Sequence, residues 1–231
     1  MQEQLNNIKF AAAETVVTIE GGKVNEPDED VIISVPETQT TNTTITGKSI
    51  LVKDYTYEDS YVKFTATEDV DISNLDNSGT LPKSVSNAQV NINTEGYVKI
   101  TDSELNQNGY NAIEIGLSKP SKSIVIDGVT FGGNLTNNAI SIHDTEDGAV
   151  VTISNCTFVN CSNPIRLSNK SNVHVTVNIV NCEFTQWEAG MYAGMLFCQD
   201  FTSTTNEAAL ENNLFAPEKV TINVVNCTHA G

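Results

Sequence analysis

An eight-residue pattern recurs along this chain, and the spacing of its copies constrains the fold more than any other feature. The pattern has apolar residues at positions 1 and 3, Asn, Asp or Gly at position 5, and an apolar or ring side chain at position 8. Its copies are VKITDSEL, IVIDGVTF, VTISNCTF, VNIVNCEF and INVVNCTH, which begin at Val98, Ile124, Val151, Val177 and Ile222. They start 26, 27, 26 and 45 residues apart, and VDISNLDN at Val70 looks like an earlier copy. A short alternating segment at a near-constant interval predicts a stack of structural repeats.

A second, fainter pattern follows each copy by about half an interval. It occurs at 112–115 (AIEI), 139–142 (AISI), 164–167 (PIRL) and 195–197 (MLF). Alternation of this kind puts one face of a strand inward and the other outward. Since one repeat cannot bury its inner face alone, we expect the repeats to stack at about 4.8 Å into parallel sheets around a continuous apolar core.

Further positions of the first pattern predict columns of like residues along the stack. The Asn, Asp or Gly at position 5 suits a tight turn in the left-handed conformation. We expect hydrogen bonds between stacked amides, an inward column of small apolar side chains and a column of stacked rings. The members of these columns are Asn155, Asn181 and Asn226; Cys156, Cys182 and Cys227, with Val129 below them; and Phe131, Phe158 and Phe184.

Two rival folds fit the sequence less well. A β-sandwich also has short strands and turns, but it gives no reason for like residues at a constant interval. A helical solenoid needs amphipathic helices, and only residues 206–215 (NEAALENNLF) suggest one, with Asn206 as a helix cap. That stretch lies in the 45-residue interval, so we predict an insertion at about 199–219 that is either a surface loop or a contact element.

The signature Ile-x-Ile-x-Asn-Cys-x-Phe, repeated over residues 98–231, resembles the right-handed parallel β-helix superfamily of pectate lyases, bacterial adhesins and phage tailspikes or fibres. The resemblance implies an all-β fold, a right-handed parallel β-helix (solenoid). The same fold carries both enzymes and inert fibres, so it says little about function.

Residues 1–70 differ from the rest of the chain. They are rich in Thr, Val and Ile, with polar alternation and an acidic turn at 25–30 (NEPDED). They fit three descriptions: looser repeats, a β cap over the open end of the stack, or an attachment segment. Since solenoids need capped ends, we expect a cap. The predicted organisation is an N-terminal β-rich cap or attachment segment at 1–70 and a β-helix at 71–231.

The composition of the chain excludes several classes of partner. Its formal net charge is −17, and Arg166 is its one arginine. Nucleic acids and anionic membranes both select clustered Lys and Arg, so we expect neither as a partner. The chain has no apolar run near the roughly 20 residues that span a bilayer and no secretory signal at its start, so we expect it to fold in a cytoplasm. Its five cysteines are an odd number and are expected as buried free thiols.

The outer faces of the predicted strands offer no cluster of catalytic groups. The polysaccharide-cleaving members of the superfamily that this chain resembles use clustered carboxylates, with calcium and an Arg or Lys base or as acid and base. The outward positions are Lys99, Thr101, Val125, Asp127, Thr152, Ser154, Asn178, Val180, Asn223 and Val225 in the first strand, and Glu114, Ser141, Arg166 and Leu196 in the second. Asp127 is the one acid of the first set, and Glu114 and Arg166 are expected as isolated surface charges.

One acidic loop, 143–148 (HDTEDG), has three carboxylates that could bind calcium. Its spacing does not match an EF-hand loop, so a solvated turn is the simpler expectation. His143, His174 and His229 are scattered, and Cys156 and Cys161 lack the second pair that a zinc site needs. The sequence therefore predicts no catalytic, cofactor-binding or metal-binding residue.

These features favour a non-enzymatic structural or attachment protein of a large assembly. We expect a phage virion component (a head fibre, capsid decoration or tail protein) that is assembled in the host cytoplasm and located in the virion. The last recognisable repeat stops within a turn and leaves strand edges for another subunit, so we expect a homo-oligomer. Analogy to phage fibres favours a trimer, with capsid or tail proteins as partners and host-surface glycans as further ligands. Two alternatives stay open: a carbohydrate-active β-helix lyase or hydrolase, and a bacterial surface adhesin.

Overall fold

The computed structural model describes residues 19–80, 88–106, 108–133, 135–169, 173–185, 196–200 and 220–230. These residues form 22 strands and no helix, so the all-β prediction is confirmed. The strands pair in parallel and lie in two curled sheets. Within the described part of the chain, no helix has the length and apolar character needed to cross a membrane.

The smaller sheet has eight strands rich in Val, Ile and Thr, the residues that fit a pleated, half-buried surface. In β3, buried and half-buried residues alternate, as expected when one face points inward. In spatial order the strands are β1 (Lys23–Glu26), β3 (Thr43–Gly47), β5 (Val62–Ala66), β8 (Val90–Asn93), β11 (Ile113–Ile115), β14 (Leu135–Ile142), β17 (Cys161–Asn169) and β20 (Leu196–Asp200).

The larger sheet has 14 strands in two rows, and β4 pairs with members of both rows. The first row is β2 (Val31–Gln39), β4 (Ile50–Glu58), β6 (Val70–Ser73), β9 (Tyr97–Thr101), β12 (Ser123–Asp127), β15 (Ala149–Ser154), β18 (Val175–Val180) and β21 (Val220–Val225). The second row is β7 (Leu75–Ser78), β10 (Glu104–Leu105), β13 (Thr130–Phe131), β16 (Thr157–Val159), β19 (Glu183–Thr185) and β22 (Thr228–Ala230).

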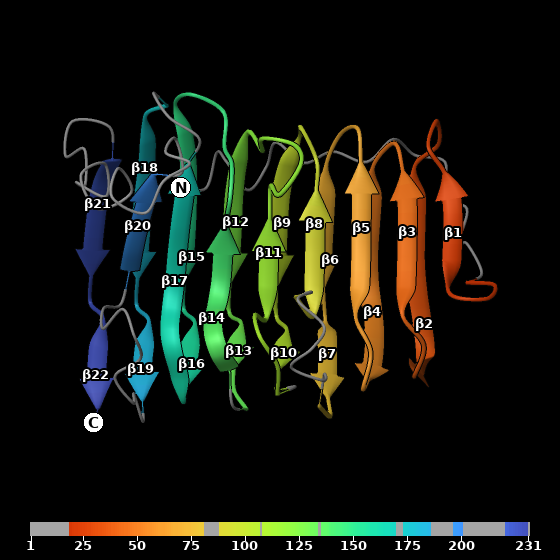
Figure 1. The fold of residues 1–231 in the computed structure, drawn as a ribbon, viewed down its shortest axis with the longest axis horizontal. Helices are drawn as coiled ribbons and strands as arrows, with labels where there is room; N and C mark the ends of the chain where they lie inside the picture. Colours follow the sequence, from red (N-terminus) through yellow and green to blue (C-terminus); the bar gives the residue numbers. More distant parts are fainter. Residues whose placement is uncertain are drawn as a thin grey trace, which may run out of the picture.

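The chain alternates between the sheets in a fixed order. From β8 onward, a strand of the smaller sheet is followed by one strand of the first row and one of the second, and the chain then returns to the smaller sheet one position further along. We call three such strands, for example β11, β12 and β13, a repeat. Figure 1 shows the strands side by side from β1 at one end to β21 and β22 at the other. The molecule is a stack whose axis runs across its strands.

The strand register confirms both sequence patterns. The copies of the first pattern pair in the order Val70, Val98, Ile124, Val151, Val177 and Ile222. The second pattern pairs in the order Ile113, Ile140, Ile165 and Leu196. Leu196 therefore occupies the register position of the buried Ile165, and the expectation that it lies at an outward position is wrong. Phe197 is the residue that pairs with the outward Arg166.

The described part of residues 1–70 belongs to the same two sheets. Val31 pairs with Ile50 and Ile50 with Val70, so the first inward column continues to β2, with less chain between its members than in the later repeats. The predicted boundary between residues 70 and 71 falls inside β6. Of the three descriptions of this region, looser repeats fits residues 19–70. Residues 1–18, the stretch 201–219 of the predicted insertion and its suggested helix at 206–215 lie outside the described residues.

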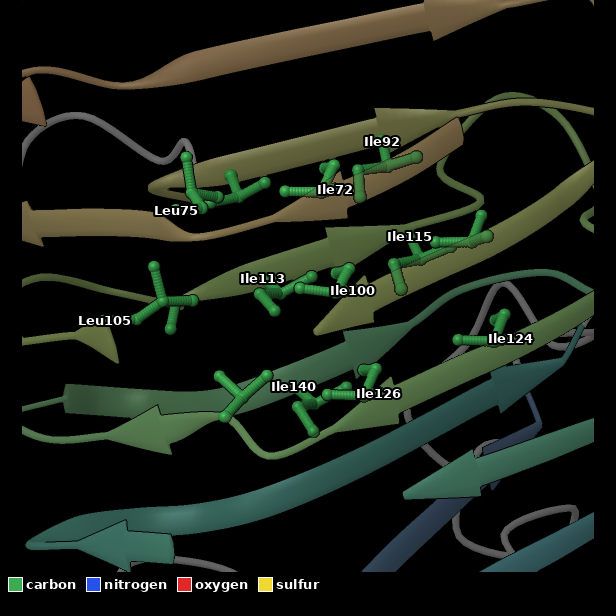
Figure 2. Packing of buried hydrophobic residues seen from close by; sticks show 14 of the residues in the cluster. Ile72, Leu75, Ile92, Ile100, Leu105, Ile113, Ile115, Ile124, Ile126 and Ile140 are labelled. Atoms are coloured by element: carbon green, nitrogen blue, oxygen red, sulfur yellow. The ribbon is translucent and has the colours of Figure 1, made fainter. Parts of the chain in front are cut away.

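The core is a set of apolar columns that run the length of the stack. Ile72, Ile100, Ile126, Ile153 and Ile179 are successive partners in the first row, and all are fully buried. Figure 2 shows side chains from both sheets, including Ile100, Ile126 and Ile140, in the space between the sheets. Burying one such side chain stabilises the fold by about 1.5–3 kcal/mol, so each added repeat contributes to a shared core.

The predicted ring column is confirmed. The rings of Phe131 and Phe158 stack at a centroid distance of 4.9 Å and an interplanar angle of 9°. Those of Phe158 and Phe184 stack at 4.8 Å and 3°. The near-parallel geometry follows from the register, because the three residues are direct partners on neighbouring strands.

The corner between the two rows of the larger sheet has the predicted left-handed residue. Asn74, Asp102, Gly128, Asn155, Asn181 and Asn226 all have φ between 50° and 66°. Glycine, Asn and Asp adopt this conformation at the lowest cost, which explains the choice at position 5 of the pattern. The Asn155 side chain receives a hydrogen bond of 3.2 Å from the Asn181 amide, as predicted for stacked amides.

The residue after each corner points into the core. Val129, Cys156 and Cys182 are buried and Cys227 is half-buried, so the predicted inward column is confirmed. Each of these thiols donates to the carbonyl two residues earlier, as Cys156 does to Ser154 at 3.2 Å. Ser103 makes the same contact to Thr101 at 2.8 Å. At four corners a small side chain with a donor therefore closes the corner from the inside, whereas Leu75 and Val129 fill the same position without one.

Candidate functional site

A group of polar side chains with low exposure lies on the outer face of the smaller sheet around Glu114. The strand register places Asn91, Glu114, Ser141 and Arg166 in one outward column on β8, β11, β14 and β17. His143 follows β14 and donates its backbone N–H to the carbonyl of Ile115 at 2.8 Å. This backbone bond sets the histidine ring beside Glu114.

Glu114 is 8% exposed, so the prediction of an isolated surface charge is wrong for this residue. Its Oε1 accepts a hydrogen bond from the Asn111 amide at 2.9 Å and lies 3.3 Å from His143 Nε2. Its Oε2 accepts from the Asn91 amide at 3.4 Å. Two polar residues from the strand ends, Asn111 and His143, cover the carboxylate. A signal for Asn111 was present in the sequence, because Asn also stands directly before the second pattern at Asn138 and Asn163.

The Asn111 amide is itself held in place. Both the backbone N–H and the side-chain amide of Asn138 donate to Asn111 Oδ1 at 3.0 Å. The carbonyl end of the Asn111 side chain is thereby fixed, and its NH2 group is left to face Glu114. The hydrogen bonds that the Glu114 carboxylate accepts are charge-assisted and therefore stronger than neutral ones. Together with the bonds between Asn138 and Asn111, they link neighbouring repeats.

The cluster contains a serine, a histidine and a glutamate, but its geometry differs from that of a hydrolase triad. His143 Nε2 lies 3.3 Å from Ser141 Oγ and also 3.3 Å from Glu114 Oε1. A triad requires the serine and the carboxylate on opposite ring nitrogens, so that one orients the ring while the other exchanges a proton. Here one nitrogen faces both groups. The arrangement supports a structural link between repeats and not proton relay to Ser141.

Asp127, the acidic residue of the first outward set, is engaged by its neighbours. Its Oδ1 accepts hydrogen bonds from Ser154 Oγ at 2.6 Å and from the Asn155 amide at 2.7 Å. These donors belong to the next repeat, one at the end of β15 and one at the corner. Asp127 therefore continues the ladder of side-chain hydrogen bonds that Asn155 and Asn181 make.

A carboxylate pair on adjacent repeats lies in the second row, which the predicted outward positions did not cover. Asp76 on β7 is the direct register partner of Glu104 on β10. Glu104 accepts a hydrogen bond from the Asn106 amide. The signal was present in the sequence, because Asp76 and Glu104 both stand at position 7 of the eight-residue pattern. Most glycoside hydrolases use two carboxyl groups that flank the scissile bond, so a pair on neighbouring strands is a possible starting point for such a site.

The acidic loop 143–148 is tied to the next repeat. Asp147 Oδ1 accepts hydrogen bonds from the backbone N–H of His174 at 2.6 Å and from its ring Nδ1 at 3.1 Å. These bonds, the backbone one above all, lower the pKa of the Asp147 carboxyl. Among the described residues, no group of three or more His, Cys, Asp or Glu side chains is arranged to hold a metal ion.

Four cysteine thiols have no disulfide partner. Cys156, Cys161 and Cys182 are free and buried, which confirms the prediction for these three, whereas Cys227 is free but half-buried. Burial raises the pKa of the Cys161 thiol to about 12. A thiol held neutral at ordinary pH is a weak nucleophile, so Cys161 acts as apolar filling and not as a reactive centre.

No protein-family model matches this chain, and searches of the curated proteins and of the solved structures found no match either. A function is therefore argued from the fold and from the side chains described above. Fold alone does not define function, so the arrangement of the outer faces carries the argument.

Proposed function

We propose that this chain is a right-handed parallel β-helix and a non-enzymatic structural or attachment component of a large assembly, most simply a phage virion. The observation that carries the proposal is the outer surface of the stack. Its charged and polar side chains bond to one another between repeats, as Glu114 does with Asn91, Asp127 with Asn155, and Lys99 with Asp71 at 3.0 Å.

Such a surface suits a rigid scaffold. Parallel pairing along the whole stack fixes the spacing of the repeats, and ladders of side chains on the outside stiffen it further. Enzymatic sites need groups whose hydrogen-bonding capacity is left for a substrate. A particle component built this way locates to the virion, contacts capsid or tail proteins and self-associates, with a trimer suggested by the resemblance to phage fibres. Host-surface glycans are a further class of ligand for it.

The experiment is to follow the chain in its native source with an antibody raised against recombinant protein. Co-sedimentation with nucleic-acid-containing particles in a density gradient, and antibody labelling of those particles in electron micrographs, is the expected result. Absence of the chain from every particle fraction would contradict the proposal that it is a virion component. An experimental density map of the recombinant chain would test the right-handed β-helix separately.

A second candidate function, a carbohydrate-active enzyme, is favoured by the Asp76–Glu104 pair alone. The test is release of reducing or unsaturated sugar from a panel of polysaccharides. An enzyme that uses this pair would lose the release in Asp76→Asn and Glu104→Gln. Glu183→Gln is the matched control, because Glu183 stands in the same column between Thr157 and Thr228. A blank panel for the unmodified chain rejects this candidate for the substrates tested.

A further inference from the structure

The two ends of the stack differ in how well their apolar columns are covered. Val224 on β21 is the register partner of the fully buried Ile179, yet it is 47% exposed. Ile222, in the same strand, is only half-buried. At the opposite end, Val31 and Ile33 of β2 are fully buried. The apolar inner face of β21 is therefore exposed at this end of the stack.

The free side of β21 and β22 has the same backbone geometry as an interface between two repeats. β21 and β22 pair with β18 and β19 on one side, and no strand of the described residues pairs with their other side. The corner residue Asn226 already has the left-handed φ of 51° that the inner repeats share. Figure 1 shows both strands at the end of the stack. The exposed edge can therefore accept further strands without rearrangement.

Charge indicates what can approach this end. Residues 220–230 (VTINVVNCTHA) contain no Asp, Glu, Lys or Arg, although the net charge of the chain is −17. The opposite end, in contrast, has an acidic turn at 26–30 (EPDED) beside β1. Two copies that meet along β21 and β22 bring together uncharged strands of the larger sheet, although Asp200 ends β20 at the same end of the stack, whereas two copies meeting at β1 would oppose like charges at short range.

We propose that a second copy of this chain packs its own β21–β22 end against this one, end to end. The inference rests on the proposed function, of which it deepens the self-association. Because each copy offers the same surface, the contact has two-fold symmetry and the two β21 edges run antiparallel. It buries Ile222 and Val224 of both copies. The expected species is a dimer, in place of the trimer that the resemblance to phage fibres favours.

The test is the molar mass of the whole 231-residue chain by light scattering and sedimentation over a range of concentrations. A dimer is expected for the unmodified chain. Val224→Glu should weaken it by about a hundredfold or more, because the contact would bury an unpaired charge. Val225→Glu is the matched control, since Val225 is also 47% exposed but lies at an outward position of the same strand. It should leave most of the dimer intact.

Three outcomes would overturn the proposal. They are a monomer at every concentration, a trimer, and a dimer that Val225→Glu weakens as much as Val224→Glu. Hydrogen exchange separates the causes of a monomer: protected β21 amides would show that other parts of the same chain cover the edge. A cooperative thermal unfolding transition in each variant establishes that both fold. Particle co-sedimentation is measured independently, so the virion assignment and this contact can fail separately.

Discussion

The first repeats and the later repeats build the same inward apolar column with different lengths of chain. Val31, Ile50 and Val70 form one inward column, in which each member follows the last after a short stretch of chain. From Val98 onward the same column continues through Ile124 and later partners, with a longer stretch between successive members. The inward column is common to both regions because it builds the core. The additional residues of the later repeats lie outside the eight-residue pattern, since Tyr57 follows Ile50 and Leu105 follows Val98 at the same distance of seven positions.

The corner is where the two regions differ most. Strand β4 runs from Ile50 to Glu58 without interruption and pairs with both β6 and β7. Later repeats break at this point, and a left-handed residue such as Asn155 separates the two strands. Asp54 occupies the corresponding position of β4 and is absent from the described residues with positive φ. The same sheet can thus be curved by a continuous bent strand or by a left-handed corner.

The interiors differ as well. Tyr57 is in the same column as the phenylalanines, but its neighbour along that column is Asn77, and its ring contact is with Tyr55 at a tilted 42°. The Asn77 amide donates to Tyr57 Oη and to Gln89 Oε1, each at 2.8 Å. Tyr55 Oη donates to Thr43 Oγ1 at 2.9 Å. The interior of the first repeats therefore includes polar side chains that hydrogen-bond to one another, whereas the later repeats stack phenylalanine rings.

The largest effect is expected for Phe158→Ala, which removes the middle ring of the stack. Loss of a buried Phe side chain costs about 3–5 kcal/mol of unfolding free energy, with the two ring contacts included. Urea unfolding followed by circular dichroism measures the loss. Hydrogen exchange then shows whether β3 and β5 lose protection along with β13 and β19. A loss below about 1 kcal/mol would contradict the stacked-ring description of the later repeats.

Asn155→Ala should lower the free energy of unfolding by about 2 kcal/mol. Alanine is sterically disfavoured in the left-handed conformation, and it cannot make the bond to Asp127. Asn155→Gly, which adopts the left-handed conformation freely but also loses the bond to Asp127, should cost about 1 kcal/mol. Asp54→Ala, at the corresponding position of β4, should cost less than Asn155→Ala. Equal losses at the two positions would mean that the corners are alike after all. Urea midpoints of the three variants, measured side by side, decide between these outcomes.

The polar interior of the first repeats predicts sensitivity to alkali. Burial raises the pKa of Tyr57 and of Tyr55 above the ordinary tyrosine value. The folded chain then holds protons that the unfolded chain releases, so stability is full below about pH 10 and falls as the pH rises further. Tyr57→Phe should reduce this dependence, at a cost near neutral pH of about 1–2 kcal/mol for the lost acceptor of Asn77. Urea midpoints at about pH 9 and pH 11 test it; an unchanged slope in Tyr57→Phe would show that Tyr57 is not responsible.

The smallest effect is expected at the junction of the two regions, where Lys99 on β9 pairs with Asp71 on β6. The two side chains are 23% and 13% exposed, and their charged atoms lie 3.0 Å apart. Lys99→Met should cost about 0.5–1 kcal/mol and less in high salt. Lys48→Met, whose partner Glu68 is 3.5 Å away in a well-exposed pair, should have no measurable cost. A loss at Lys99 that salt does not reduce would point to lost packing and not to charge.

Sequence reasoning succeeded where like residues recur at a fixed interval. The pairing from Val70 to Ile222, the corner at Asn155 and the ring column at Phe158 each follow from a local pattern repeated by the stack. It failed where the interval changed, since the shorter first repeats, which lack a left-handed corner at β4, do not match the longer ones. It also failed at Glu114, because Asn111 and His143 approach that carboxylate from outside the strand pattern.

The sequence by itself determined the inward columns, the corner residues and the parallel register, because each follows from alternation and from residues that tolerate one backbone conformation. Only the tertiary structure decided how the outward side chains are covered. That depends on how loops of different length fold across neighbouring repeats, and it enclosed Glu114 beneath Asn111 and His143. The exposed inner face of β21 likewise became visible only once every column had been followed to its last member.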